Sequence, residues 1–142
     1  MYKVKLFFAA EGIAIDKQTN NITAFNVIEQ LNFLNLPAVL QKLVVASLLE
    51  KGEEDPDKWP GKIKINLAGS NIIDQPFEHN FQGLFRTRTI MTLVGLPITE
   101  PGKMNICLCD KDDREIASYI IEVTLPKSAK IEQTEAPSSI KA

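Results

Sequence analysis

The chain has 142 residues, of which 44% are hydrophobic and 24% charged, and a formal net charge of −2. These values are typical of one globular domain, which can bury a core of its own without a disulfide or a metal. The weak negative charge disfavours nucleic-acid binding, and no apolar run approaches the length of about 18 residues that crosses a bilayer, so we expect neither a nucleic-acid nor a membrane partner.

The N-terminal segment predicts a strand. Tyr2, Val4 and Leu6 alternate with lysines, which is the period of a half-buried strand. The apolar run LFFAA is shorter than the h-region of about 7–15 residues in a signal peptide. We therefore expect a cytoplasmic protein.

The segment from Pro37 to Gly52 fits two periods. Proline at its start and glycine at its end are typical of a helix, and the apolar residues Val39, Leu40 and Leu43 would share one helical face. A strand is also compatible with the apolar pattern. Periodicity alone slightly favours the helix.

His79 is the single histidine of the chain, and it shares a strand face with Phe77 and Phe81. A general base needs a nucleophile or a substrate pocket, but the sequence contains no nucleophile-elbow, zinc-protease or phosphate-loop motif. We predict a structural imidazole, no catalytic residue and no cofactor. A hydrolase built on His79, or on Glu11 with Asp16, is the least favoured function.

Three side chains are candidate contacts for a ligand or a protein partner. Trp59 lies in the turn region before a strand with Ile63 and Ile65, where it either stacks on a sugar or caps the end of the fold; we favour the cap. Arg86 and Arg88 alternate with threonines and project from one strand face. Arginine binds phosphate or carboxylate, but on a strand it also pairs with acidic residues of a neighbouring strand, which we favour.

The stretch CLCDKDDRE predicts a β-hairpin, with strands at 103–109 and 114–124 and a turn at 110–113. Cys107 and Cys109 are too close together for the usual zinc spacing, and in a strand their Cβ atoms lie about 6.6 Å apart, too far for a disulfide. The aspartates at 110, 112 and 113 lack the pattern of a calcium loop of the EF-hand type. We predict no metal site, with a weak surface calcium site as the alternative.

The last strand has apolar residues on both faces. Tyr119 and Ile121 belong to the inward set, and Ile116 and Ile120 lie opposite it. A second apolar face predicts a covered surface and hence a homodimer or a larger oligomer. Residues 1–126 form the predicted domain, and residues 127–142, polar and without an apolar period, form a predicted disordered or partner-ordered tail.

Several segments in order resemble a known family: AEGIAIDKQTNNITAFNVIEQL, LVVASLLEKG, GKIKINLAGSNI, FRTRTIMTLVGLPITEPGKMNICLCD and IASYIIEVTLP. The family consists of small uncharacterised bacterial proteins, described as a domain of unknown function, and the similarity covers about residues 3–126. It implies a β-rich fold, a strand at about Leu43–Glu50 and a short helical turn at Pro37–Gln41. It supplies no catalytic residue.

These patterns together predict an all-β, two-layer sandwich of roughly seven or eight mainly antiparallel strands, immunoglobulin-like or jelly-roll-like. For function they favour a non-enzymatic protein-interaction or assembly module. The alternative is a module that binds a sugar or a small anion through Trp59, or through Arg86 and Arg88.

Overall fold

The computed structural model describes residues 2–126 of the chain, and this part contains nine strands and no helix. The strands are β1 (Lys3–Ile15), β2 (Ile22–Val27), β3 (Gln30–Asn32), β4 (Ala38–Glu50), β5 (Lys58–Leu67), β6 (Ser70–Asn80), β7 (Arg86–Ile98), β8 (Gly102–Asp110) and β9 (Glu115–Thr124).

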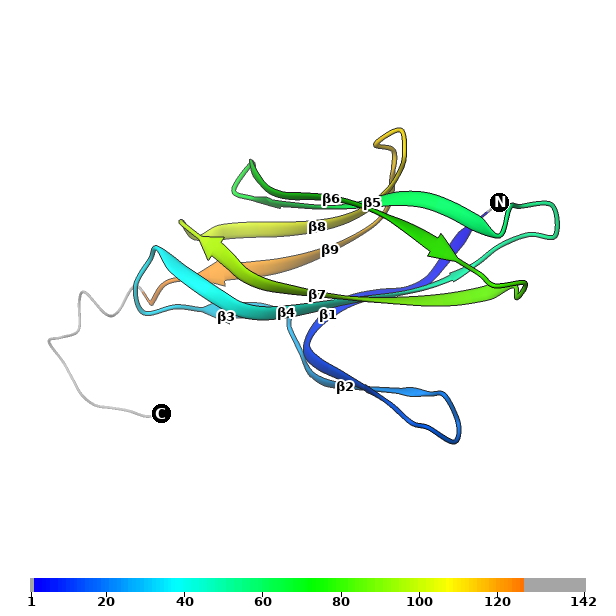
Figure 1. Cartoon of the computed structure of the whole chain (residues 1–142). Helices are drawn as coiled ribbons and strands as arrows, with labels where there is room; N and C mark the ends of the chain where they lie inside the picture. The colour runs from blue at the N-terminus through cyan, green and yellow to red at the C-terminus, as the bar shows by residue number, and fades with distance from the viewer. Residues whose placement is uncertain (1, 127–142) are drawn as a thin grey trace, which may run out of the picture.

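The strands form two sheets that lie one above the other (Figure 1). One sheet has four strands in the order β2-β1-β4-β7, and the other has five in the order β3-β9-β8-β5-β6. All pairs are antiparallel except the short pair of β3 with β9. The predicted all-β sandwich is confirmed, with nine strands in place of roughly seven or eight.

The core lies between the two sheets and follows the period-two patterns of the sequence. Ile63 and Ile65 of β5, with Ile106 and Leu108 of β8, point into it and are at most 2% exposed. In β5 the alternate residues Lys62 and Lys64 are only partly buried, because successive side chains of a strand point to opposite faces. In β8 the alternate residues Cys107 and Cys109 are buried as well. The hairpin of β8 and β9 is also confirmed, with its turn at the expected aspartates.

The segment after Pro37 is a strand along its whole length, so the implied helical turn at Pro37–Gln41 is wrong. β4 begins at Ala38 and pairs with β7 from that residue onward. The strand implied at about Leu43–Glu50 is part of β4. Leu43–Ser47 are buried on both faces of the sheet, and a doubly buried strand has a continuous apolar run rather than an alternating one. That run is what made the periodicity ambiguous.

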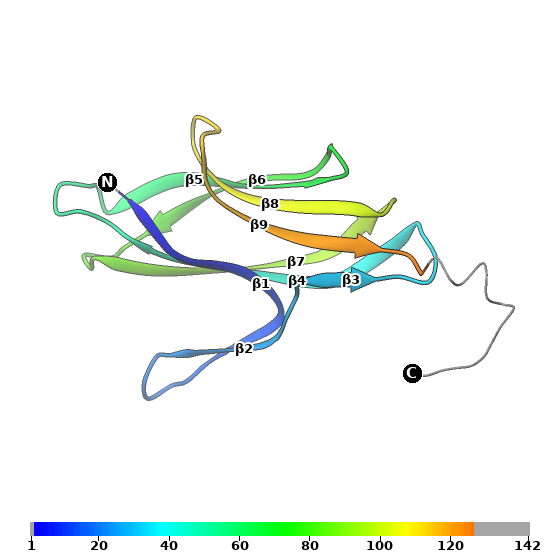
Figure 2. The ribbon, with the colours of Figure 1, turned by 180° about the vertical axis from the view of Figure 1, so that it is seen from behind.

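β1 is shared between the sandwich and a hairpin that leaves it. Its first part pairs with β4, and its last part pairs with β2 on the opposite edge; Ala10 is the switch point, since it pairs with Val44 on one side and Val27 on the other. The hairpin of β1 and β2 bends away below the rest of the four-stranded sheet, as Figure 2 shows from behind. We call residues 11–27 the arm.

Two further expectations concern the ends of the chain and the membrane. The predicted tail, residues 127–142, lies outside the described residues. In residues 2–126 there is no helix that is long and apolar enough to cross a membrane.

Candidate functional site

The arm and the outer face of the four-stranded sheet enclose two adjoining hollows, which we call the arm cleft. The larger has a volume of about 600 Å³ and lies between the tip of the arm and the start of β7. The smaller, of about 160 Å³, lies beside it over Leu6, Ile22 and Ala46. Leu48 and Arg88 line both, so Arg88 stands where the two hollows meet.

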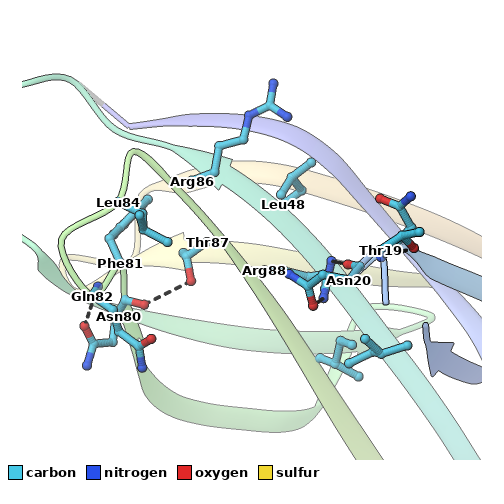
Figure 3. A pocket seen from close by; sticks show the side chains of 13 residues that line it. Thr19, Asn20, Leu48, Asn80, Phe81, Gln82, Leu84, Arg86, Thr87 and Arg88 are labelled. Carbon is cyan, nitrogen blue, oxygen red and sulfur yellow. Dashed lines mark hydrogen bonds between the residues drawn. The ribbon is translucent and has the colours of Figure 1, made fainter. Parts of the chain in front are cut away.

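The two arginines predicted as contacts differ in their surroundings, although they do share one face of β7. Arg88 points toward the arm tip and donates to the carbonyl O of Asn20 at 3.0 Å and to its Oδ1 at 3.1 Å (Figure 3). Arg86 points away and donates through Nε to Glu50 Oε2 at 2.6 Å on the neighbouring strand. Among residues 2–126, Arg88 has no carboxylate within ion-pair distance. Within residues 2–126, the hydrogen-bond acceptors recorded for its guanidinium are the two oxygens of Asn20.

The tip of the arm is held in shape by Asp16. Its Oδ1 accepts the backbone N–H groups of Gln18 at 2.8 Å and Thr19 at 3.0 Å, and these bonds lower the pKa of the carboxyl group. Glu11 instead accepts a hydrogen bond from the Asn26 side chain at 3.0 Å. Each carboxylate thus has its own local role in the arm, which gives no support to a catalytic pair of Glu11 and Asp16.

Three large apolar side chains of the arm are about half exposed to solvent. Phe25 and Val27 of β2 are 52% and 49% exposed, and Ile15, at the end of β1, is 50% exposed. Sequence reasoning missed these residues as a site. The available signal was the uncharged stretch ITAFNV, which has apolar residues at both parities and so on both faces of a strand.

His79 belongs to a stack of rings at one end of the core. The Trp59 ring stacks with the Tyr2 ring, at 4.3 Å between ring centroids, and with the His79 ring, at 5.1 Å. His79 is fully buried, its Nδ1 lies 3.2 Å from Thr89 Oγ1, and burial lowers its pKa to about 4. The imidazole is neutral at pH 7 and closed off from solvent, in keeping with the structural role predicted for it.

Trp59 borders a third hollow of about 280 Å³, which Asp110 and Asp112 also line. The indole already stacks against two other rings, that of Tyr2 at an interplanar angle of 11° and that of His79 at 23°. A sugar that stacks on tryptophan needs a free face. The geometry therefore favours the capping role for Trp59 over the ligand role.

The turn of CLCDKDDRE uses its aspartates for local bonds. Asp110 Oδ1 accepts the N–H groups of Asp112 and Arg114, each at 2.9 Å, and Asp113 pairs with Lys62 at 2.7 Å. Cys107 and Cys109 are free thiols, as predicted. No group of three or more His, Cys, Asp or Glu residues in the described part of the chain is placed to hold a metal ion, so the calcium alternative gains no support.

Comparisons with known proteins found a solved structure that aligns with this chain, but no matching protein family. No protein-family model and no curated protein matches the chain. A crystal structure of a β-glucosidase from Listeria innocua in complex with glucose aligns with 87% of this chain at a TM-score of 0.48 and 11% identity. The chain spans 16% of the length of that enzyme. This likeness carries no argument about function, and the resemblance to the bacterial family stays a prediction.

Proposed function

We propose that the chain is a non-enzymatic protein-interaction or assembly module, and that the arm is the element that holds its partner. The main support for this proposal is that the hairpin that leaves the sandwich has three half-exposed apolar side chains, Ile15, Phe25 and Val27. A two-stranded hairpin is only marginally stable in water by itself. Covering these side chains would remove apolar area from water and stabilise the arm.

The surroundings of the candidate catalytic groups, His79, Glu11 and Asp16, also support a non-enzymatic function. His79 is buried within the ring stack, and the carboxylates of Glu11 and Asp16 serve the local structure of the arm. The hydrolase hypothesis, which rests on His79 or on Glu11 with Asp16, needs at least one of these groups beside a substrate. We therefore keep the hydrolase as the least supported function.

The test is native mass spectrometry of the chain purified from its own host. We expect an assembly that contains protein subunits and no small-molecule or metal adduct. Phe25→Lys should abolish the assembly, whereas Leu34→Lys, at a residue that is 81% exposed outside the arm, should leave it intact. A monomer that carries a bound small molecule would contradict the proposal.

One observation favours a second candidate function, the binding of a small anion in the arm cleft. Arg88 lines both hollows and lacks a carboxylate partner within residues 2–126. A phosphate or carboxylate group could accept from its guanidinium with charge-assisted hydrogen bonds. Titration of inorganic phosphate up to about 10 mM should then shift the amide NMR signal of Asn20, and Arg88→Gln should remove the shift. An unchanged spectrum would reject this candidate.

A further inference from the structure

Within the part of the chain that the structure describes, β2 has one backbone edge with no strand beside it. It is the terminal strand of the order β2-β1-β4-β7, and among residues 2–126 it pairs with β1 alone. Its sequence, ITAFNV, contains neither a charged residue nor a proline. Those are common devices that keep an edge strand from pairing with another chain. The strand at the opposite edge of the same sheet, β7, carries Arg86, Arg88 and Pro97.

The hydrogen bond at the arm tip shows which backbone groups face that edge. Asp16 N–H donates to Asn21 O at 2.8 Å. Residues of an antiparallel strand alternately turn their N–H and C=O groups toward one neighbour and then toward the other side. The backbone groups of Thr23 therefore point to β1, and those of Ile22 and Ala24 point to the free edge.

We propose that β2 pairs with β2 of a second copy of the chain, antiparallel across a two-fold axis, so that the two four-stranded sheets become one continuous sheet. This inference deepens the proposed function and rests on it. It names the partner as the same chain and the contact as the free edge of β2.

Charge and symmetry support a second copy as the occupant. Because β2 has no charged side chain, two copies of it can lie side by side without like charges facing each other, and the strand offers nothing to select an acidic or a basic partner. If the two-fold axis is normal to the sheet, the side chains on one face of β2 lie beside those on the same face of β2 in the second copy. Phe25, which is 52% exposed, can then lie opposite Phe25 of the second copy or opposite its Thr23. Aromatic and β-branched cross-strand pairs of this kind stabilise sheets.

The experiment is analytical ultracentrifugation of the full chain at about 5–200 μM, with circular dichroism to check the fold. Ala24→Pro is the sharpest variant, because it removes an N–H that faces the free edge and leaves the N–H groups that bond to β1. Phe25→Lys is the second variant, since it brings a charge into the pair and keeps the backbone. Leu34→Lys is the matched control outside the arm.

We expect a dimer for the unchanged chain and for Leu34→Lys, and a folded monomer for Ala24→Pro and Phe25→Lys. If Ala24→Pro does not fold, Phe25→Lys decides the result. A monomer of the unchanged chain at 200 μM would overturn self-pairing, while a hetero-assembly in native mass spectrometry would keep the broader function. A dimer that survives in folded Phe25→Lys would place the contact elsewhere and overturn the role of β2.

Discussion

Strand β1 belongs to both the sandwich and the arm, but its apolar residues differ in burial between the two regions. Up to Ala10 the strand lies beside β4, and Ala9 and Ala10 have no exposed surface. A few residues further on, Ile15 is 50% exposed although it is the larger apolar residue. The difference shows that burial in this chain depends on whether a second layer covers the strand, and much less on how apolar the strand is. The core of the sandwich is enclosed between its two sheets, whereas the arm keeps apolar side chains that are about half exposed.

The largest expected effect is a difference in stability: truncating an apolar side chain should lower the free energy of unfolding much more in the sandwich than in the arm. Leu49→Ala, in the core, should lower the free energy of unfolding by about 2–5 kcal/mol, because it removes buried methyl groups and leaves a cavity. Phe25→Ala, in the arm, should cost less than about 1 kcal/mol, since its side chain is already half exposed. Urea denaturation at about 1 μM protein measures both. Equal costs would mean that the arm is part of the core.

The same contrast explains what the sequence could and could not predict. The alternation of β5 places Ile63 correctly, because one face of this strand is buried and the other is partly open to solvent. The alternation of β8 also places Ile106 in the core, although Cys107 and Cys109 on its other face are buried too. The arm could not be predicted in this way, since a local pattern does not say whether a second layer covers it. The buried run of β4 misled the helical interpretation for the opposite reason, because both of its faces are covered.

The candidate site was predicted only in part. The sequence placed Arg86 and Arg88 on one face, as the structure does. It could not distinguish them, because their partners are remote in sequence: Glu50 lies 36 residues from Arg86, and Asn20 lies 68 residues from Arg88. Which arginine pairs with a carboxylate and which contacts the arm depends on the folded structure.

A second prediction tests the sandwich through His79. Its pKa is lowered to about 4 in the folded state, so between about pH 6.5 and pH 4 the unfolded chain binds more protons than the folded chain. This contribution to stability is complete above about pH 6.5 and is lost as the pH falls, by at most about 1.4 kcal/mol per pH unit. His79→Gln should flatten the pH dependence in that window. Parallel curves for the two proteins would mean that His79 stays accessible to protons.

The smallest effect concerns the contact between the arm and the sheet. Arg88→Gln removes the charged donor that holds Asn20, and should cost about 1 kcal/mol locally. Hydrogen exchange of the backbone amides at 20–24 should become faster, and that of β8 should not change. Arg86→Gln is the matched control on the same strand face, because it breaks the pair with Glu50 and leaves the arm contact. If both variants act alike on the arm, Arg88 is not its anchor.

The most direct test of the account removes the arm. Ala10 and Val27 are cross-strand partners, so Asn-Gly in place of residues 11–26 closes the strands with a two-residue turn. Sedimentation and urea unfolding of this shortened chain, beside the full chain at about 100 μM, provide the decisive measurement. We expect the shortened chain to be a cooperatively folded monomer and the full chain to be a dimer. A shortened chain that does not fold, or one that associates as the full chain does, would contradict the division into a self-sufficient sandwich and an arm that binds the partner.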